Sequence, residues 1–221
     1  MLTDLPIEDV IDDVRRALAD RGIGILTAPP GSGKTTVVPI RLLDEPWRDG
    51  GKIVVLEPRR IATRAAARRI AELMGESVGD RVGYVTRDDR RTSDRTVIEV
   101  VTEGVLNRRL QSNPELPGTA AVLFDEVHER NLQTDLGLAL TLDVRASLRP
   151  DLRVLLMSAT IDAERIADRI AAEPVPVVIG EARTYPIDLR WMPQPSRTGI
   201  EVGVSTAVRK ALDSVDGDVL V

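Results

Sequence analysis

One segment near the amino terminus restricts the possible folds more than any other feature of the sequence. The apolar run Ile23 to Ala28 leads directly into Ala28-Pro29-Pro30-Gly31-Ser32-Gly33-Lys34-Thr35, and Thr36 begins an apolar helix-like stretch. Glycines let the backbone curl its N–H groups around a phosphate, a lysine and a helix N-terminus attract the anion, and a hydroxyl can bind Mg²⁺. The segment therefore predicts a strand, a phosphate-binding loop and a helix, in that order.

The scarcity of lysine in this chain strengthens the interpretation of the segment as a phosphate-binding loop. The chain has only three lysines, Lys34, Lys52 and Lys210, so a lysine in this slot favours a functional role over a plain Gly/Ser turn. Two details depart from the simplest pattern. Ala28 stands where glycine is usual, so its backbone must suit a residue with a side chain, and Pro39 should weaken the following helix.

Short apolar runs alternate with helical stretches along the chain. Each run is short enough for a strand buried on both faces; the candidates are Ile23 to Ala28, Ile53 to Leu56, Val97 to Val101, Ala120 to Phe124 and Val154 to Met157. Helical spacing is clear in Ile7 to Leu18, Ile61 to Met74 and Leu132 to Leu148. This order predicts an α/β fold, a mostly parallel sheet with helices on both faces and ligands at the carboxyl ends of its strands.

A second chemical signal follows one of these strands. The run Ala121 to Phe124 ends in Asp125-Glu126-Val127-His128, which places two carboxylates at a strand end. Asp125 is expected to hold Mg²⁺ directly or through water, and Glu126 to orient and deprotonate the attacking water, with Thr35 completing the candidate metal site. A solvated acidic pair and a satisfied surface or core histidine are the alternatives for these positions.

Composition sets limits on partners and location. The net charge of −5 gives no general attraction to nucleic acid, so any such binding needs a local group of arginines. With no cysteine, disulfides and thiolate metal sites are excluded. No apolar run approaches the roughly 18 residues of a membrane span, so we expect no membrane partner and a cytoplasmic location.

The last part of the chain differs from the rest. Tyr185 to Pro195 alternates like a two-sided strand, Ile200 to Leu212 is helix-like, and Asp218 to Val221 looks like the start of a buried strand. We therefore expect one domain over residues 1–180, followed by a linker and the beginning of a second domain over residues 181–221.

Five short strings along the chain together resemble the motifs of one family. In order they are Ala28 to Thr35, Glu57-Pro58-Arg59-Arg60, Thr102-Glu103-Gly104, Asp125 to His128, and Ser158-Ala159-Thr160. This order resembles motifs I, Ia, Ib, II and III of the DEAH-box RNA helicases. Longer strings around these motifs are most similar to the bacterial HrpB-type branch; they include Thr102 to Leu110, Phe124 to Arg130 and Met157 to Asp162. Val127 stands where the family name has alanine, a small apolar exchange that should leave the carboxylates in place.

The resemblance implies a RecA-like P-loop domain, the first of two motor domains, that uses ATP and Mg²⁺ to move along single-stranded RNA. In it, Lys34, Asp125, Glu126 and His128 would be catalytic, and Arg69 would flank the adenine. Pro58, Arg59, Arg60, Thr102, Glu103 and Gly104 would contact the RNA backbone, and the Thr102 to Gly104 string would form a turn. Ser158, Ala159 and Thr160 would couple the nucleotide state to RNA binding.

The same resemblance predicts partners within a longer chain. Motifs V and VI, with arginines facing the nucleotide, are expected in a second RecA-like domain and are followed by further C-terminal domains. Two other functions stay open: another P-loop NTPase, and an RNA-binding module with a vestigial nucleotide site. No asparagine is followed by lysine, which argues against a guanine-reading switch.

Overall fold

The computed structural model describes residues 5–159, 163–170, 174–181, 188–192, 199–214 and 218–220. The chain divides into two compact units, Met1–Arg183 and Thr184–Val221. The first unit contains the sheet and every residue of the candidate site that the structure describes. In the second unit, α7 (Ile200–Ser214) matches the helix expected there and has no buried residue.

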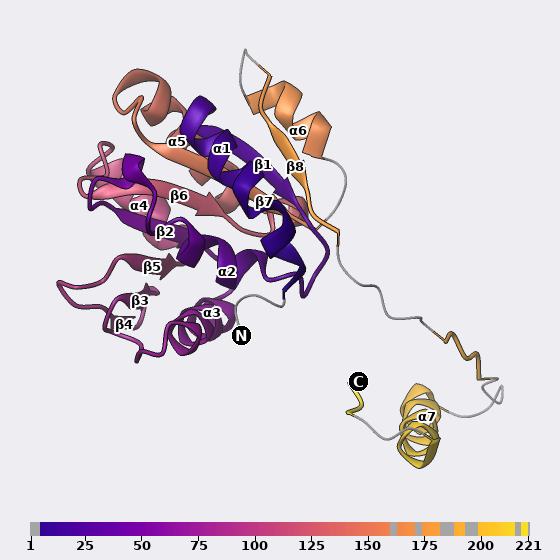
Figure 1. Ribbon diagram of the computed structural model, residues 1–221. Coiled ribbons are helices and arrows are strands. Elements are labelled where there is room, and N and C mark those ends of the chain that lie inside the picture. Colours follow the sequence, from indigo (N-terminus) through magenta and orange to yellow (C-terminus); the bar gives the residue numbers. More distant parts are fainter. Residues whose placement is uncertain are drawn as a thin grey trace. The chain divides into compact units, whose positions relative to one another are not determined.

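An eight-stranded sheet forms the centre of the first unit (Figure 1). Its strands are β1 (Ile23–Thr27), β2 (Lys52–Leu56), β3 (Val82–Val85), β4 (Arg90–Arg91), β5 (Ile98–Val101), β6 (Thr119–Phe124), β7 (Arg153–Ser158) and β8 (Val177–Ile179). The order across the sheet is β4-β3-β5-β2-β6-β7-β1-β8, and β4 alone runs antiparallel to its neighbour. The mostly parallel α/β fold expected from the sequence is confirmed.

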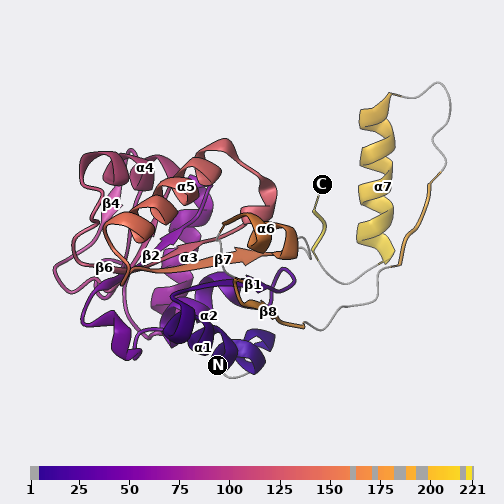
Figure 2. The same ribbon diagram turned by 90° about the horizontal axis from the view of Figure 1, so that it is seen from above.

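Helices cover both faces of this sheet. The α-helices are α1 (Ile11–Arg21), α2 (Lys34–Arg41), α3 (Arg60–Leu73), α4 (Glu103–Ser112), α5 (Leu132–Ser147) and α6 (Ala163–Ile170). The described residues also form the short 3₁₀ helices η2 (Pro6–Val10), η3 (Pro46–Arg48) and η4 (Val127–Glu129). Helices α1, α2 and α3 pack on one face and α4, α5 and α6 on the other, as Figure 2 shows for most of them.

Alternating side chains of the central strands supply both cores. In β2, Ile53 and Val55 belong to the core under α1, α2 and α3, whereas Val54 and Leu56 belong to the opposite core. The side chains of a strand point alternately to the two faces, so a strand covered on both sides must be apolar throughout. This explains why the central strands appear in the sequence as continuous apolar runs.

The helix predicted at the amino terminus begins differently from the expectation. Its first turn is the 3₁₀ helix η2, and α1 follows from Ile11. Helix α1 ends at a glycine, because Gly22 has a left-handed backbone with φ of 68° and its N–H donates to the carbonyl of Leu18 at 3.1 Å. Helix α2 continues through Pro39, which is buried, and ends two residues later.

The predicted strand-like segments of the second unit are absent where the structure describes them. Residues 188–192 and 218–220 have no regular secondary structure, and Leu220 is fully exposed. A strand needs a neighbour to satisfy its backbone groups, and none of the described residues pairs with these segments. Positions 185–187, 193–195 and 221 of the predicted segments lie outside the described residues.

In the part of the chain that the structure describes, no helix combines the length and apolarity that crossing a bilayer requires.

The packing of α3 against the sheet can be tested by substituting one buried and one exposed isoleucine of this helix. Ile70 is fully buried in the core under α1, α2 and α3, whereas Ile61 on the same helix is 83% exposed. We expect Ile70→Ala to lower the free energy of unfolding by about 2 to 5 kcal/mol, because it leaves a cavity. Ile61→Ala should change it by less than about 0.5 kcal/mol. Urea unfolding of both variants measures the difference, and equal losses would contradict the packing described.

Candidate functional site

The loop between β1 and α2 has the backbone that a phosphate-binding loop needs. Gly31 and Gly33 have φ values of 77° and 102°, a left-handed region that residues with side chains rarely adopt. The carbonyl of Gly33 accepts the first helical N–H groups, from Thr36 at 3.1 Å and Val37 at 2.8 Å. Ala28 is not among the described residues with positive φ, which explains how alanine can replace glycine there.

Lys34 extends its ammonium group back into this loop. Its side chain is buried, and Nζ donates to the carbonyl oxygens of Ala28 at 2.7 Å and Pro29 at 3.3 Å. Ser32, also buried, has a hydroxyl with no partner among the described residues. The Lys34 ammonium and the Ser32 hydroxyl therefore both lie at this loop, and such a combination is suited to binding an anionic ligand.

A hydrogen bond joins the loop to the acidic strand end. The Thr35 hydroxyl donates to Oδ2 of Asp125, and the Asp125 N–H donates to the carbonyl of Leu56 at 3.0 Å. Asp125 is fully buried. A hydroxyl oxygen and a carboxylate oxygen thus meet at one point, and both are ligands that Mg²⁺ accepts.

Burial changes the protonation of this carboxylate. Burial and the charge of Glu126 raise the pKa of Asp125 to about 6, although the Thr35 hydrogen bond and the Lys34 charge lower it in part. Among the described residues, no three His, Cys, Asp or Glu side chains form a metal cluster. Such a site suits Mg²⁺ held by one or two protein groups together with phosphates and water, and not an all-protein cage.

Glu126 and His128 lie next to Asp125 and reach towards β7. Glu126 has a left-handed φ of 53°, and its N–H donates to Oδ1 of Asp125 at 3.0 Å. The Nδ1 atom of His128 accepts the Ala159 N–H at 3.3 Å and lies 3.3 Å from Glu126 Oε2. His128 therefore connects the acidic strand end to Ala159, which follows Ser158, the buried last residue of β7. Thr160 lies outside the described residues.

Glu57 is a member of this site to which the sequence analysis gave no role of its own. It follows β2 and is buried. Leu56 pairs with Phe124 across β2 and β6, so Glu57 and Asp125 follow paired residues on neighbouring strands. Burial, together with the charges of Asp125 and Glu126, raises the pKa of Glu57 to about 8. Only the strand order reveals this third carboxylate, because Glu57 is far from Asp125 in sequence.

The arginines expected to contact RNA are exposed. Pro58 and Arg59 precede α3, and the Arg59 guanidinium pairs with Glu129 at 2.5 Å. Arg60, the first residue of α3, pairs with Asp88. Exposed ion pairs of this kind are weak and exchange easily. Both guanidinium groups can therefore change partners at little cost.

The string Thr102 to Gly104 is not the turn that the resemblance implied. Thr102 is the N-cap residue of α4, and Glu103 and Gly104 form its first turn. A helix can begin directly after β5 because Thr102 keeps an extended backbone. Glu103 accepts a hydrogen bond from Thr134 of α5 at 2.6 Å, which ties the two helices together.

A groove of about 530 Å³ lies beside this helix start. Its lining includes Thr102 and Gly104 together with the side chains of Arg87, Arg108 and Arg109. Arg108 and Arg109 were not predicted as site residues, because their position beside Thr102 depends on where α4 begins. The groove provides the local group of arginines that an acidic chain needs to bind nucleic acid.

Arg69, which was expected to flank the adenine, pairs with a residue of its own helix. It lies on α3 and is exposed, and its guanidinium pairs with Glu72 at 3.3 Å one turn away. Among the described residues, no hydrogen bond or ion pair links it to the loop at 28–35. Its expected role beside the adenine stays a prediction.

The raised pKa of Glu57 predicts a particular pH dependence of stability. Because its folded pKa of about 8 exceeds the ordinary 4.5, the unfolded chain loses this proton first as the pH rises. The free energy of unfolding should therefore fall between about pH 5 and pH 8. Wild type should lose stability on the order of 4 kcal/mol across this range, and Glu57→Gln should abolish this loss. Urea unfolding at several pH values tests this, with exposed Glu115→Gln as control; parallel curves for wild type and Glu57→Gln would contradict it.

Comparisons with known proteins agree with this geometry. A model of the DEAD/DEAH box helicase family matches residues 9–168. The ATP-dependent RNA helicase HrpB of Escherichia coli (strain K12) is 43% identical over 219 residues, which are 99% of this chain and 27% of that protein.

Two solved structures are also similar. A crystal structure of the Escherichia coli DEAH/RHA helicase HrpB has a TM-score of 0.89 at 44% identity, and covers 97% of this chain and 27% of its own. A crystal structure of the E. coli DExH-box NTPase HrpB has a TM-score of 0.81 at 44% identity, with 97% and 26% covered. The chain thus spans about a quarter of the length of these relatives. Because the family match covers well over half of the chain and includes both the phosphate-binding loop and Asp125, this chain belongs to the DEAD/DEAH box helicase family.

Proposed function

We propose that this chain is the first motor domain of an ATP-dependent RNA helicase, which binds ATP with Mg²⁺ and hydrolyses it to move along or remodel RNA. The observation that carries the proposal is the hydrogen bond from Thr35 to buried Asp125, with the Lys34 ammonium held in the same loop. The similarity to an ATP-dependent RNA helicase over 99% of the chain supports it.

The residues of the loop would bind the phosphates of ATP. Lys34 would exchange its bonds to the Ala28 and Pro29 carbonyls for the β- and γ-phosphates, beside the N–H groups of residues 31–36. Thr35 and Asp125 would hold Mg²⁺, with Glu126 close by. When bound, this ion neutralises charge on the phosphates during phosphoryl transfer.

Glu126 would orient and deprotonate the attacking water. Its carboxylate is partly exposed, and its backbone is fixed by the left-handed turn and by Asp125 Oδ1. His128 lies between this carboxylate and the Ala159 N–H. A change at Glu126 can therefore reach residues 158–160, which we propose couple the nucleotide state to RNA binding.

RNA would bind along the exposed arginines and the groove beside α4. Arg59 and Arg60 would exchange Glu129 and Asp88 for phosphates, and Thr102 and Gly104 would contact the backbone at the helix start. Phosphate contacts of this kind give affinity without sequence preference, and they weaken as salt rises.

We further propose that residues 1–180 form the motor domain and residues 181–221 lead into a second RecA-like domain, followed by further domains, in a cytoplasmic protein. The second domain would supply arginines that stabilise the charge of the transition state. Without them, hydrolysis should fall by about 10³-fold or more. This chain alone should therefore bind nucleotide far better than it hydrolyses it.

Lys34→Ala tests the nucleotide site. Removing a buried cation that faces the phosphates should weaken Mg²⁺–ADP binding by about 30-fold or more, below detection. Lys52→Ala is the matched control, because Lys52 starts β2 and so lies at the opposite end of its strand from the acidic residues. Calorimetric titration compares the two, and unchanged affinity in Lys34→Ala would exclude this loop as the phosphate site.

Glu126→Gln tests the proposed water-positioning residue in a protein that also contains the second motor domain. The amide keeps the size of the side chain but cannot accept the proton of the water. ATP should bind with nearly wild-type affinity, while steady-state hydrolysis falls by about 100-fold or more. A phosphate-release assay measures turnover, and wild-type turnover would assign the role to another residue.

A further inference from the structure

The N-terminal 3₁₀ helix η2 lies directly against the phosphate-binding loop. The Ile7 N–H donates to the carbonyl of Ser32 at 3.2 Å, and the Ile7 side chain is fully buried. A Cβ built on Gly33 would lie 3.1 Å from Ile7 Cγ2 and 3.2 Å from Leu5 Cδ1, closer than most real Cβ contacts. Leu5 and Ile7 therefore cover the left-handed turn that starts α2.

The same isoleucine reaches the beginning of the loop. A Cβ built on Gly180 would lie 3.2 Å from the Ala28 Cβ and 3.8 Å from Ile7 Cδ1. Ile7 and Ala28, at the beginning of the loop, thus border Gly180 and belong to one core, and Ile7 also lies beside Gly33 at the end of the loop. In a close-packed interior, a side chain at this position limits how far the two ends can move.

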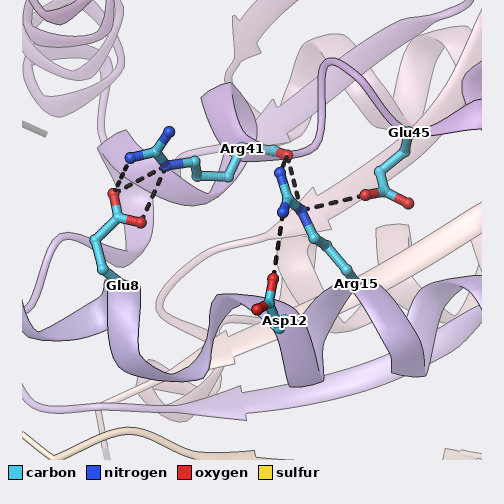
Figure 3. Close-up of polar contacts among 5 residues, drawn as sticks. All are labelled: Glu8, Asp12, Arg15, Arg41 and Glu45. Atoms are coloured by element: carbon cyan, nitrogen blue, oxygen red, sulfur yellow. Dashed lines mark hydrogen bonds and ion pairs between the residues drawn. The ribbon is translucent and has the colours of Figure 1, made fainter. Parts of the chain in front are cut away.

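Ion pairs hold the far end of α2 to the same N-terminal segment (Figure 3). The Arg41 guanidinium makes three contacts of 2.8 to 3.0 Å with the Glu8 carboxylate. Arg15 of α1 donates to the Arg41 carbonyl at 2.8 and 3.2 Å and pairs with Glu45 at 3.2 Å. The exposed fractions of Arg41 and Glu8 are 30% and 17%, so solvent screens this pair less than most surface pairs.

We propose that Ile7 and Glu8 are positioning residues for the phosphate-binding loop: η2 holds both ends of α2 and so presets the loop and Lys34 for nucleotide. This inference rests on the function proposed above. The family match begins at residue 9, so neither residue belongs to the part of the chain that the family model describes.

The physical basis is preorganisation. A loop that is already ordered loses less conformational entropy when the ligand binds, so its affinity is higher. Ile7 and Glu8 touch the loop and α2, and not Asp125 or Glu126. Their loss should therefore raise the dissociation constant of the nucleotide, and KM for ATP, while kcat changes little.

Glu8→Gln is the first test, measured as Mg²⁺–ADP affinity by calorimetry together with the melting temperature without nucleotide. We expect affinity to fall by about threefold to thirtyfold, the range typical of residues that act through packed neighbours. The matched control is Glu76→Gln, which breaks the ion pair with Arg81 at 3.3 Å, in which Glu76 is 23% exposed. Its affinity should change by less than about twofold for a similar change in melting temperature.

Two further variants keep the test decisive. Ile7→Ala should weaken binding and the conservative Ile7→Val should restore most of it. The charge exchange Glu8→Arg with Arg41→Glu should recover affinity lost in Glu8→Gln. If Ile7→Ala does not fold, Glu8→Gln and the charge exchange decide.

Wild-type affinity in Glu8→Gln, or a loss equal to that of Glu76→Gln, would overturn the proposal and leave η2 a purely structural element. The proposed function fails in a different way. A folded wild-type protein that does not bind Mg²⁺–ADP, or that binds it as well after Lys34→Ala, would overturn the nucleotide site itself and this inference with it.

Discussion

The hydrogen bond from Thr35 to Asp125 joins two segments that are 90 positions apart in sequence, and the rest of the site depends on it. It forms because β1 and β6 both pair with β7 in parallel, so their carboxyl ends reach the same edge of the sheet. The loop after β1 and the acidic residues after β6 then have to meet. Every further contact of Lys34, Glu126 and His128 is built around this point.

This arrangement carries an electrostatic cost. The charges of Asp125, Glu126 and Glu129 help to raise the pKa of buried Glu57, and the charge of Glu126 helps to raise the pKa of buried Asp125. Thr35 and Lys34 offset only part of it at Asp125. Three carboxylates close together at the ends of β2 and β6 repel one another and lower the stability of the fold. The same negative charge favours the binding of a divalent cation with its phosphates. The pattern agrees with the general finding that functional sites are less stable than the surrounding fold would allow.

The loop itself is held from two directions. On the sheet side, the Ala28 N–H donates to the Ser158 carbonyl at 3.0 Å, which ties the loop to the strand that precedes Ala159. On the opposite side, Ile7 packs against the loop, and Glu8 and Arg15 fix the end of α2. The first contact links the nucleotide site to the segment proposed to respond to RNA. The second links it to Ile7 and Glu8, which precede the family match.

The sequence by itself determined the phosphate-binding loop, the central strands and the pair Asp125-Glu126, because each is encoded locally by glycine positions, apolar runs and neighbouring residues. It did not determine β3 or the edge strands β4 and β8, which are short and depend on their neighbours. The family resemblance also implied a turn at Thr102 to Gly104, but α4 begins there, and Glu103 in its first turn accepts a hydrogen bond from Thr134 of α5. The position of Glu57 beside Asp125, the pairing of Arg59 with Glu129 and the packing of Ile7 on the loop were decided by the tertiary structure alone. These contacts follow from the order of strands in the sheet and the docking of η2, which bring together residues that no local pattern connects.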